Sequence, residues 1–167
     1  MKKIYKGFHY CLNFLNFKPY INKNYIEQSY IVNFTNSCKY NIGKDQSDIN
    51  KLFGISYGYH HDQSDRIGWR YNIKTNTIDI LLYSYENKKR YSFHLCSHPL
   101  NTNINISLKV KLTKNYRFVE IKFLDQTKTY CFTHNLKNWG YTLGSYFGGN
   151  KTAPHTIKFM LKKVKFN

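Results

Sequence analysis

The segment His94–His98 carries three side chains that bind metals well, because His94, Cys96 and His98 stand at alternate positions. Alternate side chains of a β-strand point to one face and lie about 7 Å apart, a spacing that imidazole and thiolate ligands tolerate. The pattern therefore predicts a zinc site with one coordination position open. The segment ends in Pro99 and no acidic partner for the imidazoles is identifiable, so an ordinary strand is the competing interpretation.

Two other segments offer groups that suit an organic ligand. A polar loop that begins with two histidines runs into an aromatic ring and a guanidinium, which stack and donate hydrogen bonds. Farther along, an aromatic-glycine-glycine-amide segment lets a sugar ring or a partner's backbone approach closely. A core position for the tryptophan and a purely structural role for the glycines are the alternatives. The predicted ligand-binding residues are His60, His61, Trp69, Arg70, Tyr146 and Asn150.

The groups that common catalytic mechanisms need are missing. The nine carboxylates are scattered, and no expected strand carries two of them on one face, as the acid and nucleophile of a glycosidase require. The sequence also lacks a serine–histidine elbow, a phosphate-cradling loop and a dinucleotide-binding fingerprint. We therefore expect a non-catalytic protein that uses no cofactor.

The formal net charge is +17, which suits a nucleic acid or another polyanion as partner. The excess is almost entirely lysine, whereas proteins that read bases and phosphates favour the planar fork of arginine. Abundant Lys, Asn, Ile and Tyr also match the codons of an A/T-rich genome, so composition alone could account for the charge. The candidate polyanion-binding residues lie near the two ends of the chain: Lys2, Lys3, Lys6, Lys158, Lys162, Lys163 and Lys165.

The strongest periodicity in the chain is two, which is typical of β-strands with one buried face. In the segment 104–112 every even position is apolar and every odd position is polar, which predicts Ile104 to Leu112 as a strand and its lysines as exposed. A second strand, 116–124, should bury Val119, Ile121 and Phe123. About ten such strands with turns between them predict an all-β fold, an antiparallel two-sheet sandwich or jelly roll.

Smaller features refine this picture. The segment 77–85 is apolar on both faces and should be a central strand, and Asp48 to Phe53 could form one helical turn. The apolar face of the last strand slips after Leu161, which predicts a bulge at Lys162 and Lys163.

The chain reads as one domain, 1–167, with neither linker nor internal repeat. Its charged opening lacks the apolar stretch of a secretion signal, and no segment is long and apolar enough to span a bilayer. We therefore expect a cytoplasmic protein, or one carried within a virion. The four cysteines are far apart and are expected to stay reduced.

Two segments resemble small uncharacterised concanavalin-like jelly-roll proteins of Bacteroidetes bacteria and their phages. One is Lys51–Gly58 with the following residues to Arg70, and the other is Gly144–His155, in which an aromatic-Gly-Gly loop precedes the final strand. The resemblance implies a concanavalin-like jelly roll and a role in glycan binding or glycan cleavage. It also implies that the first and last strands lie side by side.

Three functions follow from these observations. The first is a jelly-roll module that recognises a glycan or a protein neighbour, for example as a structural component of a phage virion, and that could form oligomers. The second is a polyanion- or nucleic-acid-binding protein. The third is a glycan-active hydrolase or lyase that uses His94, His98 or His60.

Overall fold

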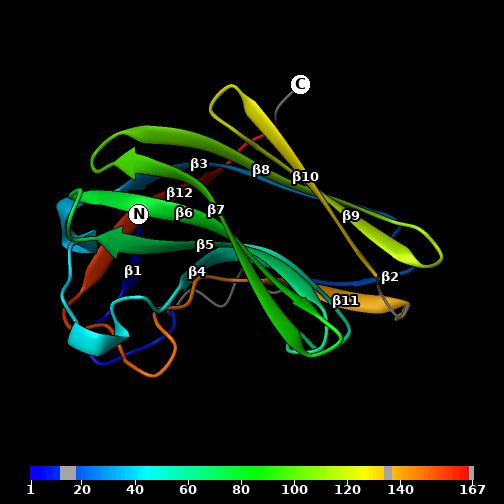
Figure 1. Ribbon diagram of the computed structural model, residues 1–167, viewed down its shortest axis with the longest axis horizontal. Coiled ribbons are helices and arrows are strands. Elements are labelled where there is room, and N and C mark those ends of the chain that lie inside the picture. The colour runs from blue at the N-terminus through cyan, green and yellow to red at the C-terminus, as the bar shows by residue number, and fades with distance from the viewer. Residues whose placement is uncertain (12–17, 134–136, 166–167) are drawn as a thin grey trace.

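Two antiparallel six-stranded sheets face each other in the computed structural model, which describes residues 1–11, 18–133 and 137–165. Sheet A has the order β1 (Lys2–Ile4), β12 (Ile157–Lys163), β3 (Tyr25–Phe34), β8 (Asn103–Leu112), β9 (Tyr116–Phe123) and β10 (Gln126–Thr133). Sheet B has the order β2 (Pro19–Ile21), β11 (Trp139–Leu143), β4 (Asn50–Tyr57), β5 (Ser64–Asn72), β6 (Thr77–Glu86) and β7 (Lys89–Pro99). The predicted all-β jelly-roll sandwich is confirmed (Figure 1).

The alternating pattern of β8 places its apolar side chains in the core, as predicted. Ile104, Ile106, Leu108, Val110 and Leu112 are all buried, whereas Lys111 is exposed and Lys109 is partly exposed. The neighbouring strand β9 buries the three predicted apolar residues and also Arg117, which continues the same alternation. The alternation of inward and outward side chains thus continues along β9 even where the inward-facing side chain is charged.

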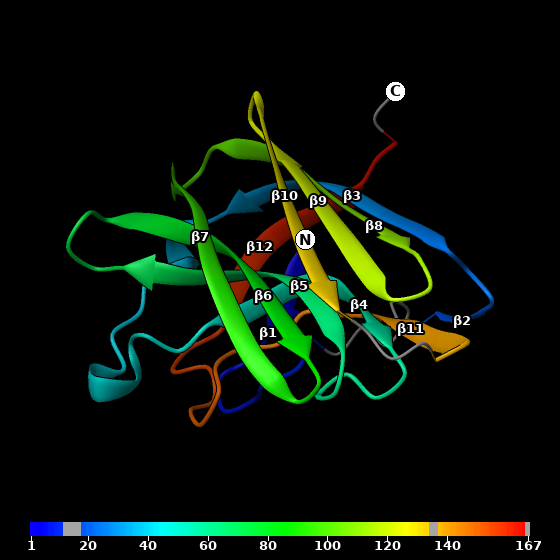
Figure 2. The ribbon, with the colours of Figure 1, turned by 45° about the vertical axis from the view of Figure 1, so that its right-hand side comes forward.

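The core between the sheets is dominated by aromatic rings. Trp69 of β5 is fully buried and packs against Phe34 of β3, with ring centroids 5.3 Å apart. At another part of the sandwich, Phe93 of β7 contacts Tyr130 of β10 at 4.7 Å. In Figure 2 the hairpin β9–β10 of sheet A lies beside β7, the edge strand of sheet B. Aromatic burial on this scale supplies a large part of the folding energy.

The strands at the two ends of the sequence are neighbours. β1 pairs with β12, and β12 pairs with β3, so the red and blue ribbons run together in Figure 1. This adjacency confirms what the resemblance implied. Strand β6, filled on both faces, lies between β5 and β7 as predicted.

Two local predictions are wrong. Asp48 does not begin a helical turn, because β4 starts at Asn50 and the 3₁₀ turns at Asn36–Cys38 and Gly43–Asp45 lie earlier. No bulge occurs at Lys162 and Lys163, since the register between β12 and β3 is regular from Phe159 to Lys163. The apolar slip marks the end of the strand instead. No helix among the described residues is long and apolar enough to cross a membrane.

Candidate functional site

A cleft of about 720 Å³ lies over the face of sheet B that points away from the core. Its floor consists of side chains from β4 to β7, and its walls come from the loops around His60 and Tyr146 and from the segment at Tyr10. Four lysine and arginine side chains are among its lining residues, namely Lys51, Arg66, Arg70 and Arg90. Asp48 is the one carboxylate among the described lining residues.

Strand register sets the order of groups across the floor. Gly54 of β4, Arg66 of β5, Tyr83 of β6 and Ser92 of β7 are cross-strand partners and form one row. Gly54 leaves room for its neighbour, because a Cβ there would lie 2.6 Å from Cγ of Arg66. A single guanidinium therefore occupies the middle of the floor, beside the phenol ring of Tyr83.

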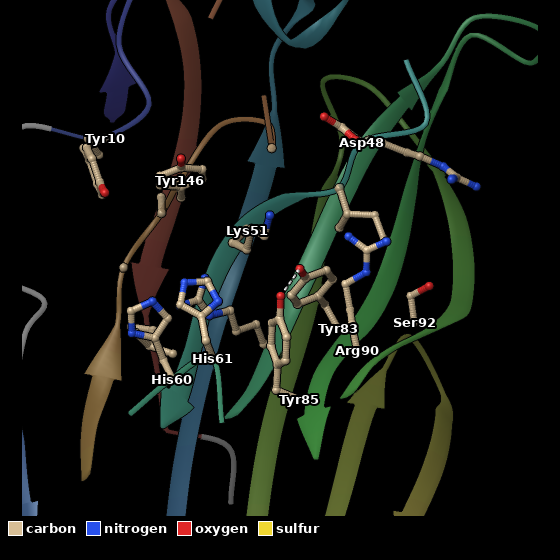
Figure 3. A pocket seen from close by; sticks show the side chains of 18 of the residues that line it. Tyr10, Asp48, Lys51, His60, His61, Tyr83, Tyr85, Arg90, Ser92 and Tyr146 are labelled. Atoms are coloured by element: carbon tan, nitrogen blue, oxygen red, sulfur yellow. Dashed lines mark hydrogen bonds between the residues drawn. The ribbon is translucent and has the colours of Figure 1, made fainter. Parts of the chain in front are cut away.

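Lys51 is the most buried cation of the cleft, with 8% of its surface exposed. Its Nζ donates a hydrogen bond to the carbonyl oxygen of Gly148 at 3.2 Å and lies 4.7 Å from the ring centroid of Tyr83 and 5.5 Å from that of Tyr146. Figure 3 shows it between these two rings. Burial lowers the pKa of Lys51 to about 8, the charge of Arg66 adds to this effect, and Asp48 opposes it.

The wall around Tyr146 is fixed by the N-terminal segment. The ring of His9 stacks on Tyr146 at 4.9 Å, and Tyr10 meets the same ring edge-on at 4.9 Å. Backbone hydrogen bonds join Tyr146 to Lys51 in both directions. The following Gly148 has φ +71°, a left-handed conformation that favours glycine.

The loop at His60 contributes two imidazoles to the cleft. Nδ1 of His60 lies 2.7 Å from the hydroxyl of Tyr141, and the ring of His61 meets that of Tyr85 edge-on at 5.4 Å. Burial, reinforced by Arg66 and His61, lowers the pKa of His60 to about 4. At neutral pH His60 therefore offers a hydrogen-bonding group without charge.

Five of the six predicted ligand-binding residues line this cleft: His60, His61, Arg70, Tyr146 and Asn150. Trp69 does not, because it is fully buried between the sheets among Phe34, Tyr40 and Phe147. Its neighbour Arg70 faces the other side of β5, where its Nε lies 3.3 Å from Asp79. Alternation along the strand explains this split.

The prediction that His94, Cys96 and His98 share one face is wrong. The register of β6 and β7 shifts between Ile80 and Leu81, which are partners of Cys96 and His94. This bulge turns His94 outward, while His98 is buried and bonds to Thr102 at 2.8 Å. In the ranges 1–11, 18–133 and 137–165, no three His, Cys, Asp or Glu side chains are grouped so that they could hold a metal ion.

The terminal lysines are brought to one edge of sheet A but not to one face. Lys3 and Lys158 are cross-strand partners on the outer side, and Lys162 lies on the same side. Lys2 and Lys163 instead line an opening between the sheets, with Lys18 and Lys23. Lys6 follows β1 and Lys165 follows β12 as exposed residues.

Sequence reasoning missed Lys51, Arg66, Tyr83 and Arg90 as members of the cleft. One signal was present, since Arg66 and Arg70 stand four positions apart and therefore share a strand face. The burial of Lys51 could not be predicted from the sequence, because Tyr83 and Tyr146, which pack over it, come from a distant strand and a distant loop.

No protein-family model and no curated protein sequence matches the chain, but solved structures with a similar fold exist. An alginate lyase, A1-II′, of polysaccharide lyase family 7 superposes with a TM-score of 0.51 at 11% identity, over 89% of this chain and 66% of the lyase, just under two thirds of its length. A xylan β-1,4-xylosidase from Bacillus halodurans C-125 gives 0.46 at 8% identity, over 84% and 28% of the two chains. A winged bean acidic lectin complexed with methyl-α-D-galactose gives 0.39 at 12% identity, over 89% and 78%. The superposition on the lyase shows that this chain has the concanavalin-like jelly-roll fold.

Proposed function

We propose that the protein binds a glycan in the cleft over sheet B. The observation that carries this proposal is the lining, in which the rings of Tyr10, Tyr83, Tyr85 and Tyr146 alternate with hydrogen-bonding groups such as Ser92 and Asn150. A sugar ring presents an apolar face to an aromatic side chain and a rim of hydroxyls to polar groups, so such a lining is complementary to it. The alginate lyase of the same fold acts on a polysaccharide, which agrees with this proposal.

Binding to a glycan array, followed by calorimetry on the best ligand, tests the proposal. We expect Tyr146→Ala to weaken binding by roughly tenfold, because a stacking surface is lost while the backbone contacts remain. Tyr116→Ala is the matched control, since Tyr116 is 48% exposed on β9 of the other sheet. Absence of any bound glycan, or equal affinity of Tyr146→Ala and the unaltered protein, would contradict the proposal. Binding of a protein neighbour alone would place the chain among assembly modules.

A second candidate function is glycan cleavage by proton transfer, as in a lyase. The contact between the Lys51 ammonium and the Tyr83 ring favours it, because the two groups have pKa values shifted in opposite directions. Burial lowers the pKa of Lys51 to about 8, and burial together with the hydrogen bond to Tyr85 raises that of Tyr83 to about 12. An amine that loses its proton easily beside a phenol that keeps it forms a base and acid pair. Hydrolysis by paired carboxylates has no such support, since Asp48 has no carboxylate partner among the described lining residues.

A further inference from the structure

Arg66 is a cation without an anionic partner among the described residues. Its Nε is buried and has no hydrogen-bond partner, and no carboxylate of the described residues forms an ion pair with it. The adjacent Asp65 points to the other side of β5 and is bound to Arg117. Burying a polar group without a partner is unfavourable, and an anion bound at the guanidinium would offset this cost.

The carboxylates nearest the cleft are already engaged. Asp79 accepts hydrogen bonds from Arg70, Asn72 and Ser97, and Asp48 accepts one from the backbone N–H of Asn150 at 3.3 Å. Lys51, Arg66 and Arg90 therefore face the same cleft with little compensation. Mutual repulsion is visible at Lys51, whose pKa is lowered first by burial, then by Arg66, and further by Arg90.

An anion bound in the cleft would give Arg66 a partner of opposite charge. It would also reduce the repulsion among Lys51, Arg66 and Arg90. The planar fork of an arginine donates two parallel hydrogen bonds to a carboxylate, and such charge-assisted bonds are stronger than neutral ones. The tyrosine rings beside the arginine, which a free inorganic anion would not use, suit the sugar that carries the carboxylate. Because the cations are gathered at one place in the floor instead of strung along an exposed path, a nucleic-acid backbone fits less well.

We propose that the cleft selects an acidic glycan and that Arg66 binds the carboxylate of one uronic acid residue, with Lys51 and Arg90 alongside. This inference rests on the proposed glycan-binding function and names its ligand class.

The test compares two polymers that differ only in charge. Calorimetry measures the affinity of the full chain for a polyuronate and for the same polymer after its carboxylates have been reduced to hydroxymethyl groups. We expect the acidic form to bind roughly tenfold or more tightly. Arg66→Met should remove this preference, and Lys111→Met, which deletes an exposed cation from β8 of the other sheet, should keep it.

Each outcome separates the two proposals. Equal affinity for the acidic and the reduced polymer would overturn the acidic ligand and leave glycan binding intact, whereas failure to bind either polymer would remove both. Single-stranded DNA that binds as tightly as the polyuronate and depends on Arg66 would also overturn it. If Arg66→Met does not fold, as judged by its melting transition, Arg90→Gln provides the same comparison at an exposed position, and an unchanged preference there and in Lys51→Met would contradict the inference.

Discussion

The amine of Lys51 is held in one place by a hydrogen bond to the Gly148 carbonyl and by two tyrosine rings. Its pKa of about 8 leaves it mostly charged at neutral pH and mostly uncharged in mildly alkaline solution. The charged form suits binding of an acidic sugar, and the uncharged form suits proton abstraction. Lys51 would therefore support binding at neutral pH and proton abstraction in mildly alkaline solution, so the pH dependence distinguishes the two candidate functions.

If the protein is a lyase for a uronic acid polymer, its rate should rise as the pH increases through about 8. The uncharged amine of Lys51 would take the proton from the carbon next to the carboxylate, and the hydroxyl of Tyr83 would protonate the departing glycosidic oxygen as a double bond forms in the sugar ring. Ultraviolet absorbance of the unsaturated product measures the rate. Lys51→Met should be inactive, and Lys51→Arg should bind polymer without cleaving it. No product at any pH would reject the lyase and leave binding untouched.

Residue types alone located the loops of the cleft and one residue of its floor, Arg70, but not the rest of the floor. His60, His61, Tyr146 and Asn150 could be predicted because loops with imidazoles, aromatics and glycines stand out from the strands. Lys51 and Arg66 look like ordinary residues of strands, and their importance depends on which rings and charges the topology places over them. Trp69 shows the converse, since a ring that looks suited to stacking lies instead in the core.

At the level of elements, a buried ion pair connects the two sheets. Nε of Arg117 on β9 lies 2.7 Å from Oδ2 of Asp65 on β5, and both side chains have no exposed surface. Asp65 also accepts a hydrogen bond from Ser84, and Arg117 donates one to the carbonyl of Tyr85. Because Asp65 and Arg66 are consecutive on β5, this pair also fixes the strand that carries the central arginine of the cleft.

Breaking this pair should destabilise the protein strongly. Asp65→Asn or Arg117→Met alone leaves one buried charge without its partner, so each should lower the free energy of unfolding by about 3–5 kcal/mol. The double variant Asp65→Leu with Arg117→Met removes both charges and should lose much less than the sum. Urea denaturation followed by fluorescence measures all three. A loss under about 1 kcal/mol in either single variant would show that the pair is not the connection described here.

Because polar and apolar residues alternate so regularly, the strands were the part of the structure that the sequence predicted best. A period of two fixed β8 and the inner face of β9, because a shift of one residue would turn every apolar side chain to water. Departures from this alternation, such as bulges, were harder to predict from the sequence. The bulge in β7 separates His94 from Cys96, and nothing in its sequence distinguishes it from a regular strand.

For the whole molecule, the topology gathers charge that is distant in sequence. β1 and β12 form one edge of sheet A, so Lys3, Lys158 and Lys162 share its outer side. None of the ion pairs among the described residues includes any of these three. Like charges on adjacent strands repel by a few tenths of a kcal/mol per pair, and a polyanion would relieve this repulsion.

We therefore predict that Lys158→Glu with Lys162→Glu elutes from a heparin column at lower salt than the unaltered protein and binds DNA with a smaller salt dependence, while the fold is kept. Lys163, although it is one of the candidate polyanion-binding residues, is left unchanged because strand alternation turns it toward the opening between the sheets. Two lost phosphate contacts should reduce the slope of log affinity against log salt by roughly 2. Lys44→Glu with Lys74→Glu, exposed in separate turns, changes the net charge equally and is the control. If both double variants elute together, the positive charge acts only through its total, and this edge of sheet A is not a specific surface.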